Sequence, residues 1–195
     1  MRGLRFRPGA CVVLEGPDGA GKTTQRRALE AASWAEPRPK FAHMPTGGTR
    51  LGEVVYDVTE HGRIESPLGR QLLHLAAHAE ALPHLRAMRA ASGLVLDRWW
   101  WSTVAYGWFG DGLRNTVSEE NFFGAIDMVW RAFGADLVLV FGARETDGAE
   151  GVLDGYDWLR ARHDGRVLDV PAALDVDEAT RFIFEQLRHA GVVAA

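Results

Sequence analysis

The sequence predicts an α/β fold of three layers, with a five-stranded parallel sheet flanked by helices. Short apolar runs alternate along the chain with segments of helical periodicity, as in strands joined by crossover helices. Two of these runs, residues 11–14 (CVVL) and 137–141 (LVLVF), are continuous, as expected of strands covered on both faces. A length of 195 residues suits one domain of ordinary size, so we expect a single domain over residues 1–195.

Composition narrows the class of protein. Hydrophobic residues make up 47% of the chain and charged residues 25%, which is typical of soluble globular domains. The net charge of -4 offers no basic surplus for a polynucleotide backbone, so we expect no polynucleotide partner. One cysteine, Cys11, excludes an internal disulfide, and no apolar run approaches the ~18 residues of a membrane span. These observations predict a cytoplasmic protein without membrane contact.

Five apolar or β-branched segments are expected to be the strands. They are residues 10–15, 40–44, 94–97, 136–141 and 166–170. Polar and glycine-rich or aromatic stretches between elements predict loops at residues 33–39 and 99–116.

Six segments have helical periodicity. They are residues 23–32, 49–60, 67–91, 118–133, 149–162 and 175–190. Pro67 suits a first helical turn, and Asp175 with Glu178 has the spacing of a capping box. Pro83 is expected to kink or divide the long third helix, because proline removes a backbone donor.

A phosphate-binding motif follows the first strand. The residues GPDGAGKTT match G-x-x-x-x-G-K-[ST] and lead into a helix, which makes a glycine-rich turn that binds nothing a poor alternative. Glycines let successive N–H groups face an anion at the positive end of the helix. Lys22 is then expected to reach the β- and γ-phosphates of ATP, and the Thr23 hydroxyl to ligate Mg²⁺. The predicted ATP-binding residues of this P-loop NTPase fold are Gly16, Gly19, Ala20, Gly21, Lys22, Thr23 and Thr24.

The rarity of lysine in the chain supports the role expected of Lys22. The chain holds 22 lysines and arginines, and only Lys22 and Lys40 are lysines. The bland explanation of the arginine surplus is a GC-rich genome, because arginine has GC-rich codons. A lysine that persists in such a chain indicates a site that needs a compact ammonium rather than a planar guanidinium.

A second pair of polar residues ends the third predicted strand. Arg98 is expected to clamp an acceptor phosphate with its fork of donors, since α/β sheets bind ligands at the carboxyl ends of strands. Asp97 is expected to hold Mg²⁺ through water. The alternative for this pair is a local salt bridge at a strand end; the P-loop upstream favours the functional interpretation.

These motifs resemble those of thymidylate kinases. The resemblance lies in EGPDGAGKTTQ from Glu15, GGTRLGE from Gly47, the helix around Leu72, and DRW with Ser102 and AY from Ala105, and it covers residues 10–141 in detail. It implies a P-loop kinase that phosphorylates a deoxynucleoside monophosphate, a small-molecule nucleotide acceptor, and a homodimer. By the same resemblance, Asp18 contacts the sugar of the acceptor or helps to position its phosphate.

The chain departs from the family pattern around the acceptor. Met44, Pro45 and Thr46 stand where the family has R-E-P, and Tyr56 aligns with a phosphate-binding arginine, for which Arg50 or Arg70 is expected to compensate. On the helix that lines the base, the family's stacking phenylalanine and its arginine align with His74 and His78. Base contact is the favoured role for these histidines; a metal pair at i and i+4 and plain helix surface are the alternatives.

The family's arginine-rich lid is the third departure. Only seven residues, GARETDG, follow Phe141 before helical rhythm resumes, so we expect a shortened lid. Arg144 is the leading candidate for the arginine that contacts the transferring phosphoryl group. Arg160 and Arg162 follow it, with an ordinary solvated helix face as the favoured alternative for these two.

Aromatic residues are concentrated in residues 99–109. At least half of these rings are expected to pack in the core, and one or two to wall the acceptor pocket. Trp101 and Tyr106 are the candidates for that wall.

The sequence thus predicts ATP-dependent phosphorylation of a thymidylate-like nucleotide to the diphosphate. The catalytic candidates are Lys22, Arg98, Asp18 and Arg144; the acceptor-binding candidates are Asp18, Arg50, His74, His78, Arg98, Trp101 and Tyr106; the metal-binding candidates are Thr23 and Asp97. Two alternatives stay open: a kinase for a modified pyrimidine nucleotide or nucleoside, and a nucleotide-binding protein with little catalysis.

Overall fold

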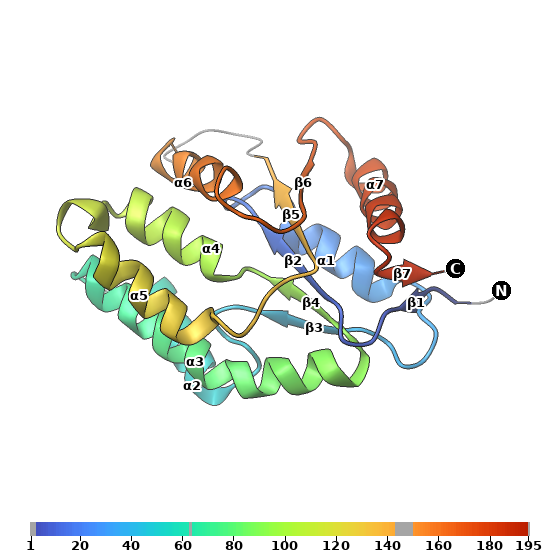
Figure 1. The fold of residues 1–195 in the computed structure, drawn as a ribbon, viewed down its shortest axis with the longest axis horizontal. Helices are drawn as coiled ribbons and strands as arrows, with labels where there is room; N and C mark the ends of the chain where they lie inside the picture. The colour runs from blue at the N-terminus through green and yellow to red at the C-terminus, as the bar shows by residue number, and fades with distance from the viewer. Residues whose placement is uncertain (1–2, 63, 143–149, 195) are drawn as a thin grey trace.

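A computed structural model describes residues 3–62, 64–142 and 150–194, and its centre is a parallel sheet (Figure 1). The strand order is β3-β4-β2-β5-β6, and every neighbouring pair is parallel. The strands are β2 (Cys11–Glu15), β3 (Lys40–His43), β4 (Leu94–Asp97), β5 (Leu137–Phe141) and β6 (Val167–Val170). This arrangement confirms the predicted five-stranded parallel sheet.

A small second sheet was not predicted. β1 (Arg5–Phe6) pairs antiparallel with β7 (Val193–Ala194), which brings the two ends of the described chain side by side (Figure 1). Two-residue strands carry too little pattern to be recognised in a sequence.

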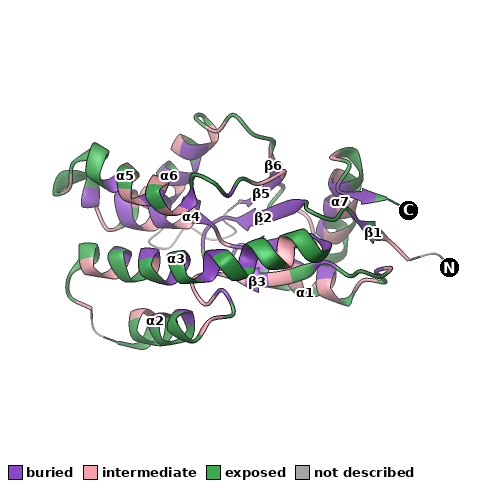
Figure 2. Cartoon of the chain, turned by 60° about the horizontal axis from the view of Figure 1, so that its bottom comes forward, coloured by how far each residue is buried: buried purple, intermediate pink, exposed green. Residues whose placement is uncertain are grey.

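Helices cover both faces of the main sheet, because side chains of β2 alternate between two cores. Val12 and Leu14 pack in the core under α1 (Lys22–Ala31) and α7 (Val176–His189). Cys11 and Val13 belong to the opposite core, formed with α3 (Pro67–Ser92), α5 (Glu119–Trp130) and α6 (Glu150–Arg160). Figure 2 shows the sheet buried between helices whose outer faces are exposed. The three-layer prediction is therefore confirmed.

Side-chain caps set where several helices begin. Thr49, Ser66 and Ser118 each accept a hydrogen bond from a backbone N–H of the first turn, at the starts of α2 (Arg50–His61), α3 and α5. The predicted capping box of Asp175 and Glu178 is present at α7. None of the described helices is long and apolar enough to cross a bilayer.

Pro83 does not divide the third helix, because α3 runs unbroken from Pro67 to Ser92. Ala81, Leu82 and Leu85 are buried on either side of the proline. Their packing against the sheet outweighs the roughly 3 kcal/mol that proline costs in a helix interior.

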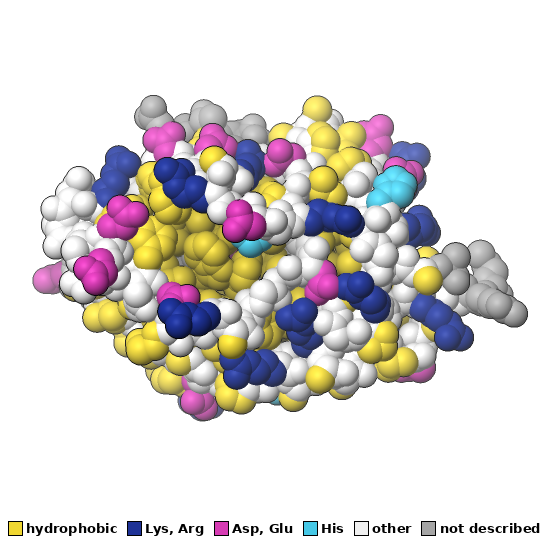
Figure 3. All heavy atoms as spheres, in the orientation of Figure 1, with side chains coloured by type: hydrophobic (Ala, Val, Ile, Leu, Met, Phe, Trp, Pro, Cys, Tyr) yellow, Lys and Arg dark blue, Asp and Glu magenta, His cyan; other side chains and the backbone are white. Residues whose placement is uncertain are grey.

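The prediction of a loop at residues 99–116 is wrong. α4 (Trp100–Ser102), a π-helical turn η1 (Thr103–Gly110) and the 3₁₀ turn η2 (Leu113–Asn115) fill this segment. The helical turns bury Trp101 and Trp108, and a Cβ at Gly155 of α6 would stand only 2.7 Å from Ala105 Cα, so α6 packs closely on η1. Apolar side chains gather in a hollow over α4, α5 and α6 (Figure 3).

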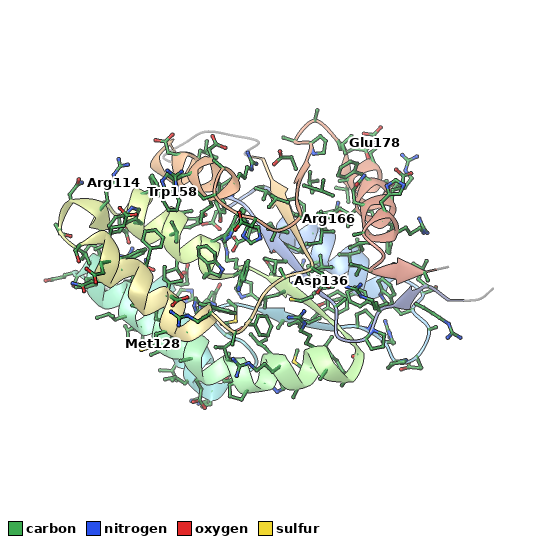
Figure 4. All side chains as sticks on the ribbon, viewed as in Figure 1. Arg114, Met128, Asp136, Trp158, Arg166 and Glu178 are labelled. Atoms are coloured by element: carbon green, nitrogen blue, oxygen red, sulfur yellow. The ribbon has the colours of Figure 1, made fainter. Side chains whose placement is uncertain are left out.

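An ion cluster closes the amino-terminal edge of the sheet. Asp136, labelled in Figure 4 just before β5, pairs with Arg7 and, at 3.0 Å, with Arg89. The backbone N–H of Cys11 donates to the same carboxylate at 2.9 Å. The opposite, carboxyl edge is left for the site.

Candidate functional site: a phosphate cradle and its cavity

The predicted phosphate loop joins β2 to α1. Gly16, Gly19 and Gly21 have φ values of 138°, 75° and 97°, a region that side-chain-bearing residues rarely adopt. A Cβ at Gly16 would also lie 2.5 Å from the carbonyl oxygen of Phe141. The glycines of the motif are therefore required by the backbone that the loop adopts.

Lys22 is buried beneath this loop. Its Nζ donates hydrogen bonds to the carbonyl oxygens of Gly16, at 2.8 Å, and Pro17, at 2.6 Å. Burial and the nearby Arg98 charge lower the pKa of Lys22 to about 8. The ammonium is thus mostly protonated at neutral pH, poorly hydrated, and placed to exchange carbonyl partners for an anion.

Arg98 comes beside the phosphate loop because β4 and β2 are neighbouring parallel strands, with Asp97 in register with Leu14. Its Nη1 donates to Ser102 Oγ at 2.9 Å and to Gly16 O at 3.4 Å. Arg98 is the one described non-glycine residue with a positive φ, 69°. This turn of the backbone aims the guanidinium across the mouth of the loop.

Asp18 and Tyr106 hold the other side of the guanidinium. Arg98 pairs with the Asp18 carboxylate, and its guanidinium lies 5.3 Å from the centre of the Tyr106 ring. The hydroxyl of Tyr106 accepts a hydrogen bond from the Asp18 backbone N–H at 2.8 Å. Burial raises the pKa of Tyr106 to about 12, so its hydroxyl stays neutral and can act as donor. The structure thus brings three predicted residues together.

Asp97 and Thr23 meet the requirements of a magnesium site. The Asp97 side chain is buried, and no described residue donates a hydrogen bond to either carboxylate oxygen; Arg26 Nε lies 3.4 Å from Oδ2. Thr23 is exposed and lines the same cavity. Free carboxylate oxygens beside an open hydroxyl suit a hydrated, oxygen-liganded cation.

A buried hydrogen-bond network lies under the loop. Glu15 accepts hydrogen bonds from the backbone N–H groups of Trp99, at 2.6 Å, and Ser102, at 3.2 Å. Its other oxygen accepts from Ser102 Oγ at 2.7 Å and lies 3.0 Å from Tyr156 Oη, which is also 3.0 Å from Gly16 O. Burial raises the pKa of Glu15. This network links α6, through Tyr156, to the start of the phosphate loop.

These groups open on one cavity of about 800 Å³. The predicted residues that line it are Asp18, Gly19, Gly21, Lys22, Thr23, Thr24, Arg70, His74, His78, Asp97, Arg98 and Tyr106. Sequence reasoning missed several other wall residues, namely His43, Gln71, Trp99 and Thr103. It also missed the role of Ser102 and Tyr156 in the network. Ser102 carried a signal in the DRW segment, whereas Tyr156 carried none.

His74 and His78 lie on the wall that α3 contributes. Burial lowers the pKa of His74 to about 4 and that of His78 to about 3, so both are neutral at physiological pH. Trp130 Nε1 donates to His78 Nδ1 at 3.2 Å. Plain helix surface is therefore the wrong interpretation for the pair. Among the described residues no cluster of three or more histidine, cysteine or carboxylate ligands forms, which gives the metal-pair alternative no third ligand.

Two predicted acceptor contacts are wrong. Trp101 is fully buried, with its ring edge-on to His163 at 5.2 Å, and it does not line the cavity. Its helical turn directs it into the core, where its large apolar area is removed from water. Arg50 is 86% exposed and pairs with Glu53, because it lies in the first turn of α2 on the solvent side. Arg70, the other candidate, does line the cavity.

Three candidate arginines follow β5 in the chain, and the two that the structure describes do not line the cavity. Arg144 lies outside the described residues. Arg160 pairs with Asp157 at 2.9 Å and Asp169 at 2.5 Å, and Arg162 stacks on Trp158 at 4.3 Å. Neither Arg160 nor Arg162 lines the cavity, which agrees with the helix-face alternative.

The chain is similar in sequence to known thymidylate kinases. A family model described as thymidylate kinase matches residues 14–128. The thymidylate kinase of Synechococcus sp. (strain JA-2-3B'a(2-13)) is 38% identical over 104 residues, 52% of this chain, and the match spans only about half (50%) of that relative. The thymidylate kinase of Chlorobaculum tepidum is 28% identical over 90% of this chain and 95% of its own length.

A solved structure extends the agreement to the fold. The crystal structure of thymidylate kinase from Ehrlichia chaffeensis superposes with a TM-score of 0.75 at 22% identity, over 93% of this chain and 100% of that one. The family model alone covers more than half of the residues, and they include the phosphate loop and the Asp97–Arg98 pair. The chain belongs to the thymidylate kinase family.

Proposed function

We propose that this chain is a single-domain kinase that transfers the γ-phosphoryl group of ATP to thymidine monophosphate, giving ADP and thymidine diphosphate. The observation that carries the proposal is that the phosphate loop and Arg98 open on one cavity large enough for nucleotide groups on both sides of them. Membership of the thymidylate kinase family supports the same acceptor.

The donor side is formed by the phosphate loop. Its backbone N–H groups and the positive end of α1 bind the β- and γ-phosphates, and Lys22 exchanges its carbonyl partners for phosphate oxygens. Thr23 and, through water, Asp97 would hold Mg²⁺, which would neutralise charge on the phosphates. Neither carboxylate oxygen of Asp97 accepts a hydrogen bond from a described residue, which supports this role.

The acceptor side is formed by Arg98, Asp18 and Tyr106. Arg98 binds the acceptor phosphate with its guanidinium fork, releasing the Asp18 carboxylate toward the sugar. The guanidinium packs over the ring of Tyr106 in a cation–π contact, which helps to hold it in place. Phosphoryl transfer needs alignment and charge neutralisation more than covalent chemistry, which these residues supply. Contact of Arg144 with the transferring group stays a prediction.

The test is a coupled assay of ADP release with ATP, Mg²⁺ and one acceptor at a time. We expect dTMP to give the highest kcat/KM among dTMP, dUMP, dCMP and thymidine, and chelation of Mg²⁺ to abolish turnover. Turnover on thymidine but not on dTMP would establish a nucleoside kinase instead. ATP binding without turnover on any acceptor would establish the nucleotide-binding alternative.

We also propose that the chain forms a homodimer through α2 and α3. Five apolar side chains on these packed helices are each at least 40% exposed: Leu51, Val54, Val58, Leu68 and Leu72. On α2 they are spaced three and four residues apart, which places them along one stripe. A second copy would remove this apolar surface from water.

Mass in solution tests the dimer. Light scattering of the unmodified chain should give twice the monomer mass of 21.5 kDa. Leu72→Glu should shift the equilibrium toward monomer, because it places a charge among the exposed apolar side chains of α2 and α3. Met128→Glu on α5, where the side chain is 82% exposed, is the matched control and should leave the mass unchanged. A monomer at the highest protein concentration would contradict the proposal.

A further inference from the structure

His78 has one ring nitrogen committed to the protein and one left for the cavity. The indole N–H of Trp130 donates to His78 Nδ1 at 3.2 Å, with the two rings edge-on and their centres 5.4 Å apart. Among the described residues, the hydrogen bond from Trp130 is the one that His78 forms through its ring, and His78 also lines the cavity. The side chain is only 3% exposed, so the ring cannot exchange these partners for bulk water.

This contact decides the tautomer of the imidazole. A neutral histidine carries its proton on one nitrogen and a lone pair on the other. Burial, and the neighbouring His74, keep the pKa of His78 at about 3, so the ring is neutral at physiological pH. Because the indole N–H of Trp130 needs a lone pair to bond, Nδ1 is the acceptor and the proton lies on Nε2. His78 therefore presents a hydrogen-bond donor to the cavity.

We propose that Trp130 is a positioning residue for acceptor specificity: it fixes His78 as an Nε2–H donor, and this donor selects a nucleobase that offers a ring carbonyl over one that offers an amino group. The inference rests on the proposed function for the presence of a nucleobase in the cavity. Thymine and uracil present the carbonyl oxygen O4 where cytosine presents the N4 amino group. Two donors that face each other in a buried wall leave both unsatisfied, which disfavours cytosine.

The surroundings of the pair make the arrangement rigid. Trp130 packs edge-on against Trp99 at 6.2 Å and Phe133 at 5.6 Å, so its indole cannot turn away without repacking α5. On the other side of His78, the ring of His74 lies nearly parallel, with centres 6.4 Å apart. Trp130 does not line the cavity, and its effect on a ligand must pass through His78.

Trp130→Phe tests the proposal, because it keeps an aromatic ring and removes the N–H. The readout is the ratio of dTMP to dCMP, measured both as kcat/KM and as binding affinity by calorimetry. We expect the variant to lower this ratio by at least about 5-fold, with the KM for ATP unchanged, since a freed imidazole can accept from an amino group.

Trp34→Phe is the matched control. Trp34 is also a buried indole, whose Nε1 donates to Leu29 O at 2.7 Å, but it lies in the core on the other face of the sheet. The control should lose comparable thermal stability and keep the dTMP to dCMP ratio. Equal ratios in the unmodified chain and Trp130→Phe would overturn the proposal, and so would equal changes in both variants.

Nitrogen-15 NMR of the unmodified chain tests the tautomer directly, without a variant or turnover. The His78 imidazole should show a protonated Nε2 and an unprotonated Nδ1, and a proton on Nδ1 would overturn the proposal. If no nucleoside monophosphate is phosphorylated, the proposed function fails, and the NMR result and the binding ratio still judge the role of Trp130 separately.

Discussion

Lys22→Ala should lower kcat/KM for ATP on the order of 10²- to 10³-fold, the usual effect of removing one charged donor that faces developing negative charge. The ammonium is the buried cation beneath the phosphate loop, and alanine leaves the carbonyl oxygens of Gly16 and Pro17 facing the phosphates without a donor between them. Steady-state kinetics and ATP titration by calorimetry measure the loss.

The other lysine of the chain is the matched control. Lys40 is exposed at the first position of β3, so Lys40→Ala should keep wild-type kinetics. The pH profile adds a second readout. Because burial lowers the pKa of Lys22 to about 8, ATP affinity of the unmodified chain should weaken as pH rises through that value, when the ammonium loses its proton. Lys22→Ala should lack this dependence, and full activity in that variant would refute the phosphate-cradle interpretation.

Arg98→Lys should lower kcat/KM for the acceptor roughly 10²-fold, although the positive charge is kept. A lysine ammonium offers no planar fork and cannot bond Ser102 while it also faces Asp18 and a phosphate. The loss should appear in kcat and in the KM for the nucleoside monophosphate, with a smaller change in the KM for ATP, because Lys22 and the loop backbone bind the donor.

Arg131→Lys provides the control for that exchange. The side chain of Arg131, the residue that caps the carboxyl end of α5, is 81% exposed and pairs only with Asp127 among the described residues, so its exchange should leave both KM values unchanged. A change confined to the KM for ATP in Arg98→Lys would place Arg98 on the donor side and contradict its assignment to the acceptor phosphate. Thermal melting should show both variants folded.

The elements that were predicted correctly are specified by residues that lie close together in the chain. Continuous apolar strands, helical periodicity and the capping box of Asp175 depend on neighbouring residues, and the structure agrees with them to within three residues. The phosphate loop is the strongest case, because its glycines are needed by its own backbone angles. Arg98 and the loop met as predicted because adjacent parallel strands end at the same edge.

The elements and contacts that were predicted wrongly or missed depend on packing between segments that are far apart in the chain. Residues 99–116 have the glycines and aromatics of a loop, yet packing of α6 against η1 makes them helical. With this backbone Trp101 lies in the core, and the buried Trp99 lines the cavity instead. Tyr156 reaches Glu15 from 141 residues away in the chain, a distance over which sequence patterns carry no signal.

The left-handed backbone of Arg98 has a consequence for how this protein balances stability against activity. An L-residue with a side chain pays on the order of 1–3 kcal/mol to hold such a conformation, and glycine would pay almost none. Selection for folding alone would therefore favour glycine at position 98, and selection for phosphate binding opposes it. The end of β4 is a place where thermostabilising substitutions are easy to find and inactivate the site.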